Sequence, residues 1–174
     1  YFFPDPYVPT EEGLHKLVAT VCEYMEVPFH RVRIRLQHDP NRTWFVDGNG
    51  DPIPHAAGTY ESGRAGYVLT FDTEELHRPD LLIATIAHEL SHARLLGERR
   101  LRDRPFDNEL LTDLTAVALG FGVFLANSPR VWSSQYSTWP GTNLVKPEYM
   151  TPPMFGYALA HAAWTSRPRS LSGR

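Results

Sequence analysis

The chain has 174 residues, a hydrophobic content of 42% and a formal net charge of −3 at pH 7. This length suits one domain with a sizeable core, and the single cysteine, Cys22, excludes an internal disulfide framework and a cysteine-rich zinc ribbon. The negative charge argues against general nucleic-acid binding, and no stretch approaches eighteen consecutive apolar residues, so we expect neither nucleic-acid nor membrane partners.

The two ends of the sequence differ in character from its middle. Residues 1–10 contain three prolines, which predict an extended arm. They show neither the basic nor the apolar segment of a secretion signal, and together with the single cysteine this favours a cytoplasmic protein; the first residue is not methionine, so we expect a trimmed or longer product. Residues 166–174 are basic and serine-rich and predict a disordered tail. We expect a single domain over residues 1–174.

The first regular elements follow the arm. Thr10 precedes two glutamates and a run of apolar residues at helical spacing, which predicts a helix that is capped by Thr10 and runs to about Glu26. Residues 31–37 alternate strictly between polar and apolar, which predicts a half-buried strand with its apolar side chains on one face. Residues 38–57 are rich in turn-forming residues.

Two short strands are expected next. Residues 58–61 and 67–71 resemble strands, and residues 62–66 resemble a tight connection between them. The mixture of such strands with long helical stretches predicts an α+β fold.

A strongly apolar helix is expected from Leu81 to Gly97, with Asp80 as its N-cap and Gly97 as a left-handed C-terminal residue. The seven residues before its HELSH motif are apolar almost all round, which is typical of a helix buried in the domain centre. Within the motif, His88 and His92 are four residues apart and therefore share one helix face, where two imidazoles can bind one metal ion. Glu89 projects about 100° round the helix from His88, beside that metal.

Two more helices complete the chain. Asp107 is expected to cap a long helix that runs to about Asn127, and residues 153–164 predict a last helix. Gly120 and Gly122 lie inside the long helix, and we expect them to permit close approach of a neighbouring helix.

A catalytic zinc ion usually takes three protein ligands, so the two histidines need a partner from another element. Glu109 and Asp113 lie at i and i+4 near the start of the long helix. If Glu109 faces the metal, Asp113 lies one turn further on and can accept the outer N–H of a ligand histidine. Three alternatives remain open: Asp113 as the ligand, Glu98 as the ligand, or a helix start that is simply solvated.

The pair of motifs, HELSH followed by NELLTD, resembles the gluzincins, which are thermolysin-like zinc metallopeptidases. The resemblance implies Zn²⁺ on His88, His92 and Glu109, with Glu89 as the general base and Asp113 as a support for a histidine. It also implies a minimal zincin-like domain, in which a small twisted sheet packs on the active-site helix and on a second, glutamate-bearing helix. The strand at residues 58–61, or its hairpin partner, would hold an extended substrate at the sheet edge.

Oxyanion stabilisation needs further donors, because thermolysin-like enzymes take them from a large second lobe for which this chain is too short. Tyr157 and His161 share a face of the last helix and are expected to act in catalysis, and Tyr149 is a third candidate. The sequence therefore predicts a zinc metallopeptidase that acts on a peptide or protein substrate. The alternatives are a binding or regulatory module that keeps the zincin frame, and a zinc hydrolase that does not cleave peptides.

Overall fold

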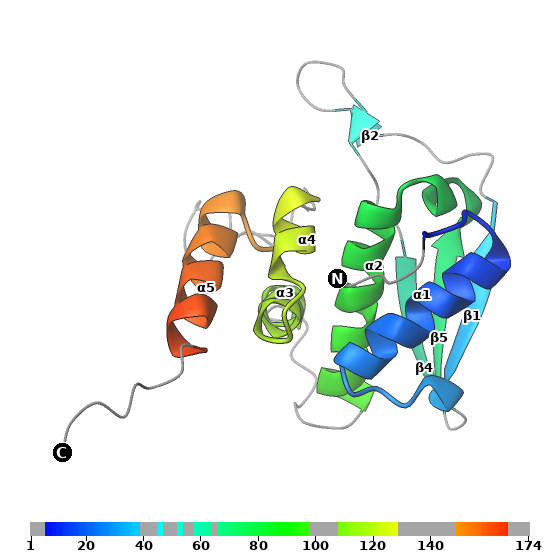
Figure 1. Ribbon diagram of the computed structural model, residues 1–174, viewed down its shortest axis with the longest axis horizontal. Coiled ribbons are helices and arrows are strands. Elements are labelled where there is room, and N and C mark those ends of the chain that lie inside the picture. The colour runs from blue at the N-terminus through cyan, green and yellow to red at the C-terminus, as the bar shows by residue number, and fades with distance from the viewer. Residues whose placement is uncertain are drawn as a thin grey trace, which may run out of the picture.

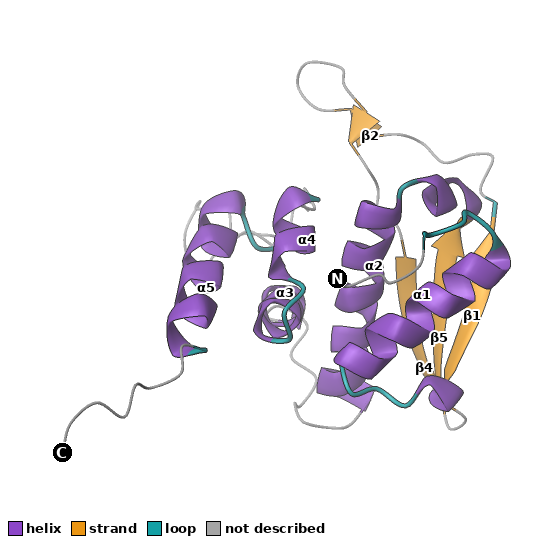
Figure 2. Ribbon diagram, viewed as in Figure 1, coloured by secondary structure: helices purple, strands orange, loops and turns teal. Residues whose placement is uncertain are grey.

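The computed structural model describes residues 6–38, 45–46, 52–53, 58–63, 66–97, 108–128 and 149–166. Along this part of the chain one α-helix is followed by all the described strands and then by the other α-helices (Figures 1 and 2), which confirms the α+β class. The arm is described only from residue 6 and the tail only at residue 166, so the predictions for both ends stay predictions. In the described part, no helix has the length and apolar character needed to cross a membrane.

The sheet has the order β1-β5-β4, from β1 (Val32–Gln37), β5 (Gly66–Asp72) and β4 (Gly58–Gly63). β4 and β5 pair antiparallel, as the expected hairpin requires, whereas β1 pairs parallel with β5. Side chains of β1 alternate between buried or half-buried and exposed, which confirms the half-buried strand. In the turn-rich region, β2 (Phe45–Val46) and β3 (Pro52–Ile53) form a second, two-stranded antiparallel pair.

Helix α1 (Glu11–Tyr24) begins after the predicted cap and ends two residues before the predicted end at about Glu26. The Oγ1 atom of Thr10 accepts the N–H of Gly13 at 3.1 Å, which confirms the predicted cap. At the other end Glu26 adopts a left-handed conformation with φ of 54°. The N–H of Val27 binds the carbonyl of Cys22, and that of Glu26 binds the carbonyl of Glu23, which is the Schellman pattern. A glutamate therefore occupies a position that usually favours glycine.

Helix α2 (Pro79–His92) carries the HELSH motif through the middle of the fold. Every residue from Leu81 to His92 is buried, which confirms a helix enclosed on all sides. The predicted cap at Asp80 is wrong, because the helix starts at Pro79 and Asp80 lies in its first turn; proline suits the first helical position, where no N–H donor is needed. The predicted end is also different, since α2 passes into a π-helical turn over Ala93–Gly97.

α1 and α2 lie against each other over the sheet (Figure 1), and α2 also contacts β4. The core between these layers is built from fully buried side chains of all three parts: Leu14, Val18 and Val21 of α1, Leu82, Ile86 and Leu90 of α2, and Leu69 and Phe71 of β5. Arg94 adds a polar link, because its guanidinium donates to the carbonyl of Met25 at the end of α1.

The predicted long helix is in fact two helices, α3 (Asn108–Ala118) and α4 (Gly122–Asn127). Gly120, with φ of 94°, ends α3 in a second Schellman pattern, because the N–H of Phe121 binds the carbonyl of Ala116 and that of Gly120 binds the carbonyl of Val117. The expected close approach is present only at Gly122, where an added Cβ would lie 2.8 Å from Leu159.

Helix α5 (Pro152–Thr165) confirms the last predicted helix. It contacts α3 and α4, and these two helices lie between α5 and α2 (Figure 1). α3 therefore has one face towards the HELSH helix and another towards α5.

Candidate metal centre

His88 and His92 of α2 and Glu109 of α3 direct their side chains to one point. The Nε2 atom of His88 lies 3.0 Å from Oε2 of Glu109 and 3.2 Å from Nε2 of His92. The third side of the triangle, from Nε2 of His92 to Oε2 of Glu109, is 3.5 Å. Among the described residues, these three form the group that can hold a metal ion.

The size of this triangle fits a metal ion. With zinc–ligand bonds of about 2.0–2.1 Å, two corners of a tetrahedral site are about 3.3–3.4 Å apart. The three observed separations, 3.0, 3.2 and 3.5 Å, lie around that value. The three atoms therefore have the spacing of three ligands in a tetrahedral metal site.

Asp113 supports the first histidine from behind. Its Oδ1 atom lies 2.8 Å from Nδ1 of His88, and both side chains are almost completely buried. Its other oxygen accepts the N–H of Met150 at 2.9 Å. Both oxygens thus have partners outside the triangle, so the structure favours Glu109 over Asp113 as the third ligand. Glu98, the other alternative, lies outside the described residues.

Thr112 supports the second histidine, and the sequence reasoning missed it. The side chain is fully buried, and its Oγ1 atom lies 3.3 Å from Nδ1 of His92. Its spacing was a usable signal, because Glu109, Thr112 and Asp113 lie at i, i+3 and i+4 and therefore on one face of α3. Each of the two histidines has an oxygen partner on the nitrogen that points away from the triangle, an arrangement that fixes ring orientation where a histidine binds a metal.

The charge of Glu109 is set by competing effects. Partial burial opposes ionisation, but hydrogen bonds from His88 and His92, and the positive charge that these rings carry when protonated, outweigh it, so the pKa of the Glu109 carboxyl lies well below its usual range. The carboxylate is therefore ionised at neutral pH, which is the form that binds a cation.

The remaining predicted residues lie in two places. Glu89 is 3% exposed on α2, next to His88, and its role as a base stays a prediction. The ring of Tyr149 lies 5.7 Å from that of His88 and is tilted by 47°. Tyr157 and His161 lie on α5, where their rings are 6.4 Å apart and Tyr157 is 76% exposed. The structure thus places Tyr149 at the centre, while Tyr157 and His161 line a separate groove; a catalytic role for these two stays a prediction.

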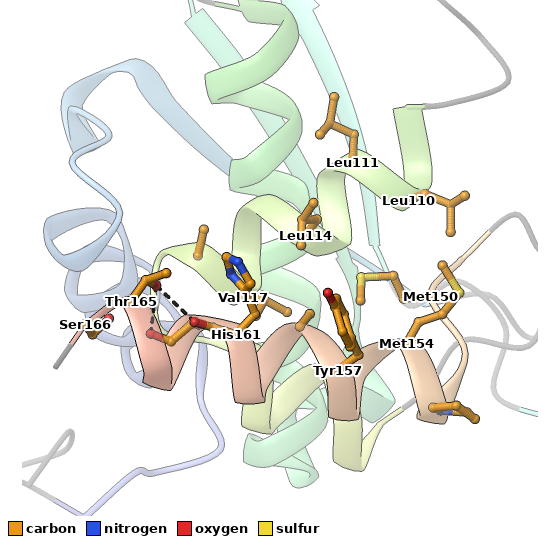
Figure 3. A pocket seen from close by; sticks show the side chains of 14 residues that line it. Leu110, Leu111, Leu114, Val117, Met150, Met154, Tyr157, His161, Thr165 and Ser166 are labelled. Atoms are coloured by element: carbon orange, nitrogen blue, oxygen red, sulfur yellow. Dashed lines mark hydrogen bonds between the residues drawn. The ribbon is translucent and has the colours of Figure 1, made fainter.

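This groove, which we call the α3/α5 groove, has a volume of about 1050 Å³. Leu110, Leu114 and Val117 form one wall, and Met154, Tyr157 and His161 form the other (Figure 3). Its lining is mainly apolar, and no side chain with a formal charge at neutral pH is among the described residues that line it.

Comparisons of the chain with protein-family models, with curated proteins and with solved structures give no match. The spacing of His88 and His92 and their meeting with Glu109 are therefore what identify this region as a possible metal centre.

Proposed function

We propose that this chain is a zinc-dependent metallopeptidase of the zincin type, with Zn²⁺ held by His88, His92 and Glu109. One observation carries the proposal. A carboxylate only accepts hydrogen bonds, so the contact with Asp113 keeps the proton of neutral His88 on Nδ1. Nε2 then presents its lone pair to the Glu109 oxygen 3.0 Å away. A metal ion between these atoms would satisfy all three ligand atoms at once, whereas a proton on Nε2 would serve a single contact.

The choice of zinc follows from the donor atoms. Two imidazole nitrogens and one carboxylate oxygen, with an open fourth position, form a common ligand set of catalytic zinc. Calcium and magnesium prefer all-oxygen surroundings. Zinc at this centre supplies Lewis-acid polarisation of water and of a carbonyl oxygen.

Glu89 is the residue we assign to proton transfer. Its carboxylate takes the proton from the attacking water and passes it to the leaving amine, so that it begins and ends the reaction ionised. Asp113 and Thr112 hold the two imidazoles in place. The hydroxyl of Tyr149, whose ring lies beside that of His88, is a donor for the developing negative charge on the carbonyl oxygen.

The edge of the three-stranded sheet offers a binding site for the substrate backbone beside the metal centre. β4 is an edge strand of the three-stranded sheet and contacts α2. An extended peptide can add to such an edge through main-chain hydrogen bonds. The scissile bond would then lie near the HELSH helix.

The proposal is tested by comparing wild type with Glu89→Gln. Both proteins are assayed for zinc stoichiometry and for cleavage of a mixed peptide library. We expect equal zinc content and a fall in cleavage of roughly two or more orders of magnitude, because the substitution removes the base and keeps the size of the side chain. Glu74→Gln, on an exposed residue of the 3₁₀ turn before α2, is the matched control and should behave as wild type.

Two results would contradict the proposal. Equal cleavage by wild type and Glu89→Gln would exclude the assigned mechanism. A wild-type protein that binds zinc and cleaves nothing in the library would favour a binding module or a zinc hydrolase with a different substrate.

A further inference from the structure

The α3/α5 groove gathers apolar side chains that are left in contact with solvent. Leu114 is 45% exposed, Met154 is 36% exposed and Tyr157 is 76% exposed, and all three line the groove. Single exposed apolar residues are ordinary on a protein surface, but a contiguous set in a concave site is typical of a binding site. The groove is therefore the described surface best suited to an apolar ligand.

The chemistry of the lining restricts the occupant. Lys, Arg, Asp and Glu are all missing from the described residues that line the groove. Phosphate groups of nucleic acids or of anionic lipid headgroups need cationic or backbone N–H donors, and a charged peptide needs counter-charges. An uncharged apolar segment needs neither cationic donors nor counter-charges, so it fits the apolar lining.

The groove adjoins the metal centre along α3 and along the segment before α5. Leu110, in its wall, directly follows the proposed ligand Glu109. Met150 also lines the groove, and its main-chain N–H is the donor that holds Asp113. Tyr149, one residue earlier, packs against His88. The same short stretches of chain therefore form part of both sites, so a polypeptide held at the centre has the groove beside it on the next side of α3.

We propose that the α3/α5 groove binds an apolar stretch of the polypeptide substrate, outside the bond that is cleaved. The inference rests on the proposed peptidase function and adds a substrate class to it. Glu109 and Asp113 face α2, whereas Leu110 and Leu114 face the groove, so the two sites occupy neighbouring sides of α3. The preferred substrates are polypeptides with clustered apolar residues, several residues away from the scissile bond.

Two labelled peptides of 20 residues and identical composition test this inference, one with six leucines in a single block and one with the same leucines dispersed. Binding is measured by fluorescence anisotropy on the zinc-loaded full chain carrying Glu89→Gln, so that the measurement does not depend on cleavage. We expect the block peptide to bind at least tenfold more tightly than the dispersed one. Leu114→Gln and Met154→Gln, added separately to this protein, should remove most of that preference.

Val123→Gln is the matched control, because Val123 is 57% exposed on α4 and does not line the groove. It should keep the preference for the block peptide. With Glu89 restored, the ratio of kcat/KM for the block peptide over the dispersed peptide should fall towards one in Leu114→Gln and remain high in Val123→Gln.

Several outcomes would overturn the inference. Equal binding of the block peptide to Leu114→Gln and Val123→Gln would show that it binds elsewhere. Loss of self-association in Leu114→Gln, with no peptide binding by the parent protein, would show that a second copy of the chain covers the groove. Groove-dependent binding without cleavage of any peptide by wild type would contradict the peptidase function, and with it the claim that the occupant is a substrate. Cleavage of both peptides at equal rates would contradict only the role of the groove.

Discussion

The Oδ1 atom of Asp113 lies 2.8 Å from Nδ1 of His88, while Oδ2 of the same carboxylate accepts the N–H of Met150 at 2.9 Å. One buried side chain therefore joins the HELSH helix to the chain segment that enters α5. It also decides which nitrogen of His88 is available to a metal, because a carboxylate partner on Nδ1 leaves the lone pair on Nε2.

Asp113→Asn should weaken zinc binding by on the order of 10–100-fold, the usual effect of losing an outer partner of a ligand histidine. The amide is isosteric, so the fold should persist, but its single oxygen can accept from only one of His88 and Met150, and its NH2 group faces the other donor. Zinc affinity is measured by competition with a chromogenic chelator, and thermal unfolding is measured in parallel. Asp80→Asn, on an exposed residue of α2, serves as the control. Unchanged zinc affinity in Asp113→Asn would show that Asp113 contributes only to packing.

Glu109→Ala should abolish stoichiometric zinc binding, because it removes the one carboxylate of the triangle. Metal content after dialysis, measured by atomic emission, is the appropriate observation. Glu98→Ala tests the alternative ligand and should retain zinc. The assignment of Glu109 fails if its alanine variant keeps one equivalent of zinc.

Thr112→Val should weaken zinc binding by roughly 3–10-fold, which is less than the effect expected for Asp113→Asn. The reason is that a neutral hydroxyl at 3.3 Å orients His92 less strongly than a charged carboxylate orients His88. Valine keeps the shape of the side chain, and Thr112→Ser should restore affinity by returning the hydroxyl. Thr115→Val is a control on the same helix, since the Thr115 hydroxyl bonds to the carbonyl of Leu111. If serine and valine at position 112 give the same affinity, packing alone explains the effect.

Glu26 and Gly120 occupy the same position in two Schellman patterns, with φ of 54° and 94°. A residue with a Cβ is disfavoured in this conformation by about 1 kcal/mol. Glu26→Gly should therefore raise the free energy of unfolding by about 1 kcal/mol, and Gly120→Ala should lower it by a similar amount. Glu26→Gln controls for the ion pair of Glu26 with Arg94. Denaturant unfolding measures all three, and a destabilised Glu26→Gly would show that the side chain contributes more than the conformation costs.

Burial raises the pKa of the Cys22 thiol from 9.0 to about 12. Between these values only the unfolded chain gives up the proton, so the thiol lowers the free energy of unfolding as pH rises above 9, by at most about 1.4 kcal/mol per pH unit. Unfolding of wild type and Cys22→Ala across this range should give a steeper decline for wild type. Equal slopes would mean that the folded thiol ionises normally.

The sequence was informative where local chemistry decides the outcome. The period of 3.6 residues placed His88 and His92 on one face, and the i, i+4 spacing of Glu109 and Asp113 anticipated the contact that Asp113 makes with His88. The cap at Thr10 and the alternation in β1 were equally predictable, since each depends on residues within a few positions of one another.

It was less informative where distant segments meet. Nothing in the alternation of β1 shows that it pairs parallel with β5, because strand pairing depends on the path of the intervening chain. Gly120 and Gly122 look alike in sequence, yet one ends a helix through its φ and the other makes room for Leu159. The sequence could not show that Tyr149 lies beside His88 while Tyr157 lies away from it. That difference depends on α3 and α4 lying between α5 and α2.

The complete enclosure of α2 has a consequence for how the stability of the chain depends on a bound metal ion. Two imidazoles and two carboxylates, those of His88, His92, Glu89 and Asp113, are buried in or against this helix, and taking such groups out of water costs free energy that their hydrogen bonds and a bound metal ion would offset. A ligand present at 100 times its Kd adds about 2.7 kcal/mol to stability, a large share of the 5–15 kcal/mol typical of a folded domain. We therefore expect removal of zinc to lower the free energy of unfolding and to make the chain more susceptible to proteolysis.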